Sequence, residues 1–237
     1  MEVREIVYFE KPERQNTDQM VKIAKKRMEE LGIQTVVIAW SSGYTFRKFR
    51  EITKGPKINI VTVTNPKGGS FPIVIRPTDS AESRKWKEGQ LKKRITEIPV
   101  SISEETQKEL EKEGIKVCYL MPDYFNFKTI LAEDENYRAA RAKLTIFGLP
   151  SHLDLLDVDA GADLSPLNMM SQGVRVSVGC AIIAVKNGLI PDGTTVLTMA
   201  GTASAVILQV SANPRKCYIR EIIGYERNPA LSAGTSE

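Results

Sequence analysis

Cysteine and histidine are scarce in this sequence, and long apolar runs are missing. Its 237 residues include three cysteines and one histidine. Cys118, Cys180 and Cys217 are odd in number and far apart, which excludes a disulfide framework and a zinc site and indicates a reducing, cytoplasmic setting. No run reaches the roughly 18 apolar residues of a membrane span, and the first residues, MEVREIVYFEK, carry charges where a signal peptide is apolar. We therefore expect a protein that is neither secreted nor membrane-embedded.

Familiar catalytic motifs are also missing. Neither GxxxxGK[ST] nor GxGxxG occurs, so a Walker loop and a standard nicotinamide fingerprint have no support. The single histidine, His152, has no GxSxG partner and is interpreted as a surface or capping residue. A run of acids has its glycine at the wrong offset for an EF-hand; we expect capping and loop residues there, with a magnesium role through a bound phosphate left open: Asp154, Asp157, Asp159 and Asp163.

Charge is nearly balanced. The formal net charge is +4, from 33 Lys and Arg against 29 Asp and Glu, and this mild excess does not indicate a nucleic-acid-binding protein. Basic residues gather from Arg84 to Arg94 around Trp86. This segment is interpreted as a solvated loop or helix, with an anion-facing or RNA-facing patch as the alternative.

Short apolar runs alternate with amphipathic ones along the chain. Asn16-Thr17-Asp18 offers N-cap chemistry for a helix with apolar positions from Met20 to Leu31. Gly32 ends that helix, as Gly114 ends a later one. The patterns predict further helices at 45–52, 104–113 and, in an ambiguous apolar segment, 168–186, and strands at 5–9, 35–40, 58–64, 116–120, 195–199, 205–210 and 217–225.

The order of these elements predicts the fold class. Helix, ELGI or KEGI, then strand occurs twice, as in the successive βα units of a parallel sheet. A turn at Ala212-Asn213-Pro214-Arg215 predicts a hairpin with an antiparallel strand at the sheet edge. We expect a single α/β domain over residues 1–237, with a basic insertion at about 70–100.

The stretch VVIAWSSGYTFRKF passes from a buried strand directly into small hydroxyl residues. Parallel sheets bind ligands beyond the carboxyl ends of their strands, and a helix that begins there offers free N–H groups and partial positive charge. Gly43 would allow close approach of the backbone, while Ser41, Ser42 and Thr45 supply hydroxyls. The loop therefore suits a phosphate, with an ordinary N-cap as the alternative.

Two other loops follow strands that would end at the same edge. One contains Asn65, Gly68 and Gly69 after the strand that ends at Thr64. The other is Ala200-Gly201-Thr202-Ala203-Ser204. The crevice rule predicts that these loops converge on one site.

The order KPERQNT, ELGIQTVVIAWSSGYT, INIVTVT, KEGIKV and a glycine-rich loop with two terminal strands resembles stand-alone relatives of the pyruvate kinase C-terminal α/β domain. The resemblance covers Ile6 to about Asn228. It implies a three-layer α/β/α sandwich around a mixed, mostly parallel sheet of about five strands with an antiparallel edge strand. It also implies bound flavin mononucleotide (FMN), with phosphate contacts from Ser41, Ser42, Gly43 and Thr45 and further contacts from Asn16, Thr17, Thr64, Asn65 and the 201–204 loop.

The sequence departs from the family pattern in two places, and two functions remain open. Residues 70–100 resemble an insertion that covers the site or mediates assembly, and Tyr44 is interpreted as a packing residue, with ligand stacking as the alternative. One expected function is an FMN protein with a redox role, since a flavin carries its own chemistry. The alternative is a non-catalytic module that senses a phosphorylated metabolite, without pyruvate kinase activity. The apolar hairpin from Val206 to Tyr225 is compatible with a homo-oligomer.

Overall fold

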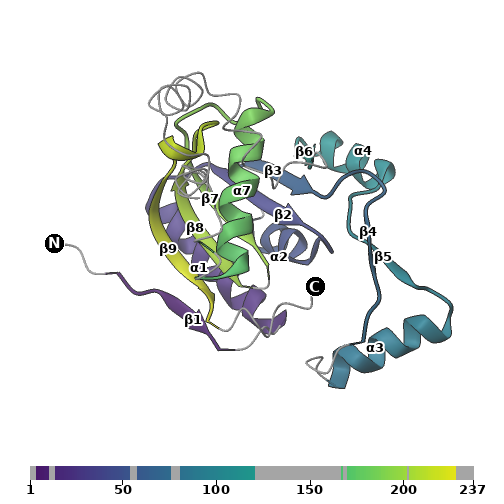
Figure 1. Ribbon diagram of the computed structural model, residues 1–237. Helices are drawn as coiled ribbons and strands as arrows, with labels where there is room; N and C mark the ends of the chain where they lie inside the picture. Colours follow the sequence, from purple (N-terminus) through teal and green to yellow (C-terminus); the bar gives the residue numbers. More distant parts are fainter. Residues whose placement is uncertain are drawn as a thin grey trace, which may run out of the picture.

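The computed structural model describes residues 4–10, 14–53, 58–75, 81–120, 167, 170–201 and 203–227. Its centre is a seven-stranded sheet with the order β1-β9-β8-β7-β2-β3-β6 (Figure 1). This arrangement confirms the α/β class, with seven strands where the resemblance implied about five. The strands are β1 (Val7–Phe9), β2 (Thr35–Trp40), β3 (Asn59–Thr64), β6 (Lys116–Tyr119), β7 (Thr195–Ala200), β8 (Ser204–Gln209) and β9 (Tyr218–Glu226).

The sheet is mostly parallel, as predicted. Among the described strands of this seven-stranded sheet, β8 alone runs antiparallel to its neighbours, β7 and β9. The predicted antiparallel hairpin is present as β8 and β9, separated by the short 3₁₀ helix η4 (Pro214–Lys216). The structure adds β1 outside this hairpin, where Val7 pairs in parallel with Gly224. This pairing joins residues from the two ends of the chain and has no local sequence signal.

Helices cover both faces of the sheet because its strands alternate apolar side chains between them. Val36 and Ile38 of β2 belong to one core with α1 (Arg14–Glu30), α2 (Tyr44–Ile52) and α4 (Glu104–Lys112). Val37 belongs to the opposite core, which α7 (Gln172–Lys186) dominates. The predicted helix in the ambiguous segment is therefore confirmed, and its nearly all-round burial explains why helical periodicity is weak there.

The ends of α1 show one correct and one wrong prediction. Asn16-Thr17-Asp18 does not cap α1 because the helix already includes Arg14, so these residues lie inside its first turns. The C-terminal prediction is confirmed, since Gly32 has a φ of 64° and the Ile33 N–H donates to the Met28 carbonyl over 3.0 Å. Such positive φ angles favour glycine.

The described residues between 70 and 99, which are 70–75 and 81–99, form a projection that we call the arm. Strands β4 (Ser70–Pro72) and β5 (Glu97–Pro99) pair as a two-stranded antiparallel ribbon, and α3 (Ala81–Lys92) lies between them in sequence. Figure 1 shows the arm extending away from the main sheet, with α3 at its far end. Within the described ranges, no helix is both long and apolar enough to cross a membrane.

Candidate functional site

A cavity of about 530 Å³ lies at the carboxyl ends of the parallel strands. Its walls come from the ends of β2, β3 and β9, from residues that follow β6 and β7, and from the first turns of three helices, α1, α2 and α7. Its lining comprises Thr17, Ala39, Trp40, Ser41, Ser42, Gly43, Tyr44, Thr45, Val63, Asn65, Phe71, Leu120, Gln172, Gly173, Arg175, Val176, Cys180, Gly201 and Glu226.

The topology explains why the cavity forms here. From β2 the chain passes through α2 to β3 on one side, whereas α7 leads into β7 on the other side of β2. The strand order therefore reverses between β2 and β7, and ligands of open α/β sheets bind beside such a switch point. Because α2 and α7 lie on opposite faces, their N-termini approach this point from both sides.

The SSGYT loop makes the first turn of α2 compact. Gly43 is the N-cap and has a φ of 72°. A Cβ built on Gly43 would lie 2.6 Å from Cζ2 of Trp40, so glycine is required both by its backbone angle and by the indole ring. Arg47 Nη2 donates to the Ser42 carbonyl over 3.0 Å, which holds the loop against its own helix.

Tyr44 and Thr45 connect this loop to neighbouring elements. The Tyr44 hydroxyl donates to Asp18 Oδ1 over 3.1 Å, which links α2 to α1. Thr45 Oγ1 donates to the Gly201 carbonyl over 3.3 Å. Two of the predicted loops, 156 residues apart in sequence, therefore meet at one edge of the cavity.

The N-terminus of α7 was not predicted as part of the site. Ser171 is its N-cap, and the Ser171 Oγ accepts from the Gly173 N–H over 3.0 Å. Arg175, one turn further, adds a guanidinium to the lining. The serine that precedes an apolar run was a usable cap signal, but no local pattern shows which strand ends the helix faces.

The cavity gathers about half of the predicted site residues. Thr17, the five residues of the SSGYT loop, Asn65 and Gly201 line it. The other described candidates do not, and Thr202 lies outside the described residues. The candidates away from the lining are Asn16, Thr64, Gly68, Gly69, Ala203 and Ser204.

Several of these displaced candidates have structural contacts instead. Thr64 Oγ1 accepts from the Ile102 N–H over 3.1 Å, and the Gly69 carbonyl accepts from the Val100 N–H over 3.0 Å. These bonds fix the base of the arm to the end of β3. Ser204 is buried and its Oγ lies 3.2 Å from the Ser171 Oγ, so it joins the β7–β8 turn to the α7 cap.

The titratable groups of the cavity do not include an activated thiol. Burial raises the pKa of Cys180 to about 12, so its sulfur stays protonated at neutral pH. The described parts of the chain contain no cluster of three or more His, Cys, Asp or Glu suited to a metal ion. His152 and the acids between Asp154 and Asp163 lie outside the described residues.

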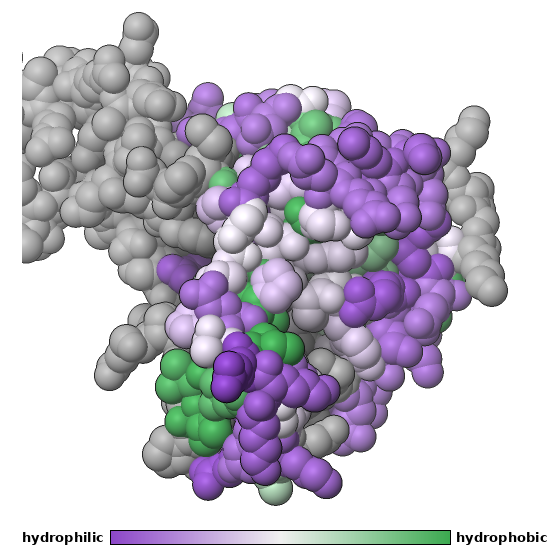
Figure 2. All heavy atoms as spheres, turned by 90° about the vertical axis from the view of Figure 1, so that its right-hand side faces the viewer, coloured by the Kyte–Doolittle hydropathy of each residue, from purple (hydrophilic) through white to green (hydrophobic). Residues whose placement is uncertain are grey.

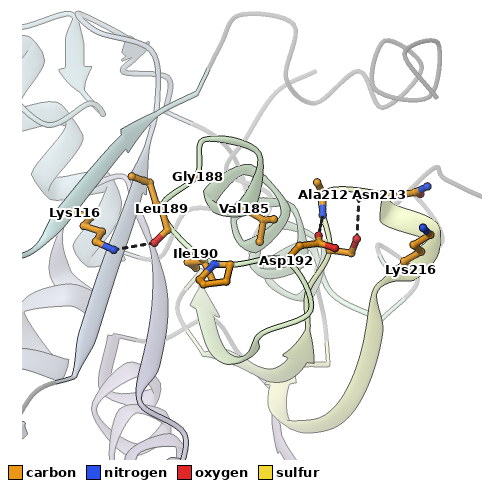
Figure 3. A pocket seen from close by; sticks show the side chains of 11 residues that line it. Lys116, Val185, Gly188, Leu189, Ile190, Asp192, Ala212, Asn213 and Lys216 are labelled. Atoms are coloured by element: carbon orange, nitrogen blue, oxygen red, sulfur yellow. Dashed lines mark hydrogen bonds between the residues drawn. The ribbon is translucent and has the colours of Figure 1, made fainter. Parts of the chain in front are cut away.

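A second cavity, of about 630 Å³, lies near the amino ends of β6 and β7 (Figure 3). Its polar groups form hydrogen bonds that hold the surrounding loops together. Lys116 Nζ donates to the Leu189 carbonyl over 3.0 Å, and Asp192 Oδ1 accepts from the Ala212 N–H over 2.7 Å. It lies away from the carboxyl ends of the parallel strands, and none of the predicted site residues lines it. We therefore assign the candidate site to the cavity at the switch point.

No protein-family model matches the sequence.

Proposed function

We propose that the protein binds FMN in the cavity at the switch point between β2 and β7. The observation that carries the proposal is the lining of this cavity, which combines helix N-termini, hydroxyls and an arginine with apolar and aromatic side chains. FMN has a phosphate at one end and a flat, largely apolar ring system at the other. A site for it needs both kinds of surface, placed side by side.

The polar side faces β2 and β7. Here the SSGYT hydroxyls, the Gly201 turn and the first turns of α2 and α7 surround the cavity, with Arg175 as the cation. Helix N-termini attract anions through their N–H groups and dipole, and arginine pairs with phosphate oxygens in a fixed fork geometry. This side would hold the phosphate.

The apolar side faces β3, β6 and the arm. Val63 comes from the end of β3, Leu120 follows β6, and Phe71 belongs to β4 of the arm. Trp40 and Val176 continue this surface toward β2 and α7. Apolar and aromatic side chains are the usual lining for a planar ring, so this side would cover the isoalloxazine.

This distribution favours FMN over the alternative of a sugar bisphosphate sensor. A sugar phosphate is polar along its whole length and would leave Val63, Phe71 and Leu120 without an apolar partner. The finer fold assignment belongs to the same proposal: a pyruvate kinase C-terminal-like three-layer sandwich, used as a flavin holder. A bound flavin would itself supply electron transfer, and the chain would bind the phosphate and exclude water from the ring.

The test is an absorption spectrum of the purified protein, followed by titration of flavin-free protein with FMN. We expect either flavin bands in the purified protein or quenching of flavin fluorescence as added FMN binds. A colourless protein that takes up no FMN would refute the proposal. Uptake of a sugar bisphosphate by such a protein would support the sensor instead.

A further inference from the structure

The arm carries an unbalanced positive charge. Residues 81–94 contain six basic residues against two acidic ones, an excess of four that equals the net charge of the whole chain. Lys92, Lys93 and Arg94 are exposed, and no ion pair within the described residues involves them. The rest of the chain is neutral as a whole, so this end of the arm is its main electrostatic feature.

The arm also exposes large apolar side chains. Five of the ten exposed large hydrophobic residues of the described chain lie on it, including Trp86 at 47% and Phe71 at 48% exposure; the others are Val74, Ile75 and Ile95. Figure 2, which views this side of the molecule, shows a green apolar patch beside purple hydrophilic atoms in its lower part. Such concentration on one projection is typical of an interaction surface.

The arm has little internal support. Its two strands pair over three residues each, and α3 makes no extensive contact with any other described helix or strand. An isolated two-stranded ribbon and a 12-residue helix are each marginal in water. A partner that covers the arm would supply the missing stabilisation.

Helix α4 has the complementary charge. Residues 104–113 contain five glutamates against two lysines, and all five carboxylates belong to exposed residues. In Figure 1, α4 lies at the base of the arm and α3 at its far end, so the ribbon holds the two helices of one chain apart. In a second copy related by a two-fold axis, the acidic α4 could pair with the basic α3 of the first copy, and the reverse pair would form as well.

We infer that the protein forms a dimer in which α3 of each chain docks on α4 of the other. The basic residues are distributed around α3 rather than opposite an apolar stripe, which does not fit a helix lying in a membrane surface. A two-fold arrangement makes the contact twice, and the exposed apolar side chains of the arm would be buried beside it. Phe71 also lines the candidate cavity, but the inference does not require a ligand there.

The test uses charge reversal on each helix in the full chain. One variant carries Lys92→Glu and Lys93→Glu, and the other carries Glu105→Lys and Glu109→Lys. Each places like charges opposite each other in both contacts of its own dimer, so we expect the dimer dissociation constant to rise at least about tenfold. Mixing the two variants should restore dimers, because each reversed helix then meets a helix of opposite charge.

Sedimentation velocity measures the outcome, and circular dichroism checks that both variants fold. Dimeric wild type, two weakened variants and a rescued mixture would support the inference. Wild type that is monomeric up to roughly 100 μM would overturn it. Dimerisation unaffected by either reversal, or weakened variants without rescue on mixing, would place the interface elsewhere and also overturn it. A monomer that binds nucleic acid through Lys92 and Lys93 would assign the arm to that partner.

Discussion

Thr45, at the start of α2, donates a hydrogen bond from Oγ1 to the carbonyl of Gly201, in the turn between β7 and β8, over 3.3 Å. This bond spans the switch point, because β2 and β7 are adjacent parallel strands that are far apart in sequence. It fixes the distance between two loops that the proposed phosphate would touch together.

Replacing Thr45 with Val should weaken this connection with little change in shape. We expect an FMN affinity about three- to tenfold lower and a loss of at most about 1 kcal/mol in unfolding free energy, since the bond is exposed. Thr45→Ser keeps the hydroxyl and is the matched control. Fluorescence titration and urea unfolding provide the two readouts. Equal affinities for Thr45→Val and wild type would show that the hydroxyl does not organise the site.

Arg175 is the cation that we expect to pair with the phosphate. Arg175→Gln should lower FMN affinity about tenfold or more, because a charge-assisted hydrogen bond contributes roughly 1.5–3 kcal/mol. Arg50→Gln is the control of equal charge, since Arg50 lies on α2 outside the cavity and pairs with Glu113. If the two variants lose affinity equally, the effect is one of overall charge and the role of Arg175 is wrong.

Gly173, in the first turn of α7, has no room for a side chain. A Cβ there would lie 2.2 Å from the Ser204 Oγ and 3.2 Å from the Ala200 carbonyl. Gly173→Ala should therefore destabilise the fold by about 1–3 kcal/mol through overpacking. Gly89→Ala is the matched control, because Gly89 is also helical but has nothing within 4 Å of the added atom, so it should be neutral or stabilising by up to about 1 kcal/mol. Thermal unfolding distinguishes them, and similar midpoints for the two variants would contradict the packing described here.

The helices and strands that have a local sequence pattern could be predicted from the sequence. Short apolar runs predicted all seven strands of the sheet to within a few residues, and Gly32 and Gly114 marked two helix ends. The contribution of β1 to the sheet edge could not be predicted, because its partner β9 is at the other end of the chain. The ribbon of the arm was also missed, since strands of three residues have too few positions to show a period.

The candidate site likewise combines residues that local patterns predicted with residues that only the tertiary fold brings together. The SSGYT loop and Gly201 were predicted to meet because both follow strands of one parallel sheet, and they do. Arg175 was missed because only the path of α7 across the opposite face brings it to that edge. Thr64 was assigned to the ligand because it ends a strand, but its hydroxyl faces the base of the arm.

Stability should fall at alkaline pH because two buried thiols are protonated in the native state. Burial raises the pKa of Cys118 to about 11 and that of Cys180 to about 12, from ordinary values near 9. The native chain then binds more protons than the unfolded chain between about pH 9 and 12. The thiols' contribution is complete below about pH 9 and is lost as the pH rises through this window.

Cys180→Ala tests this dependence. The variant should show a slope of unfolding free energy against pH that is smaller by up to about 1.4 kcal/mol per pH unit in that window, the value for one proton. Urea unfolding between pH 8 and 11 measures the slope, irrespective of any constant stability change from the lost sulfur. Parallel curves for wild type and variant would contradict a protonated, buried Cys180.

The central claim is that one side of the cavity holds a phosphate and the other a flavin ring, and one comparison tests both. Flavin-free protein is titrated with FMN and with riboflavin, which has the same ring without the phosphate. We expect both to bind, with FMN tighter by about tenfold or more, and we expect Arg175→Gln to remove most of that difference without changing riboflavin affinity. Equal affinities of the wild-type protein for the two flavins would contradict the phosphate site, and no binding of either would contradict the flavin site as a whole.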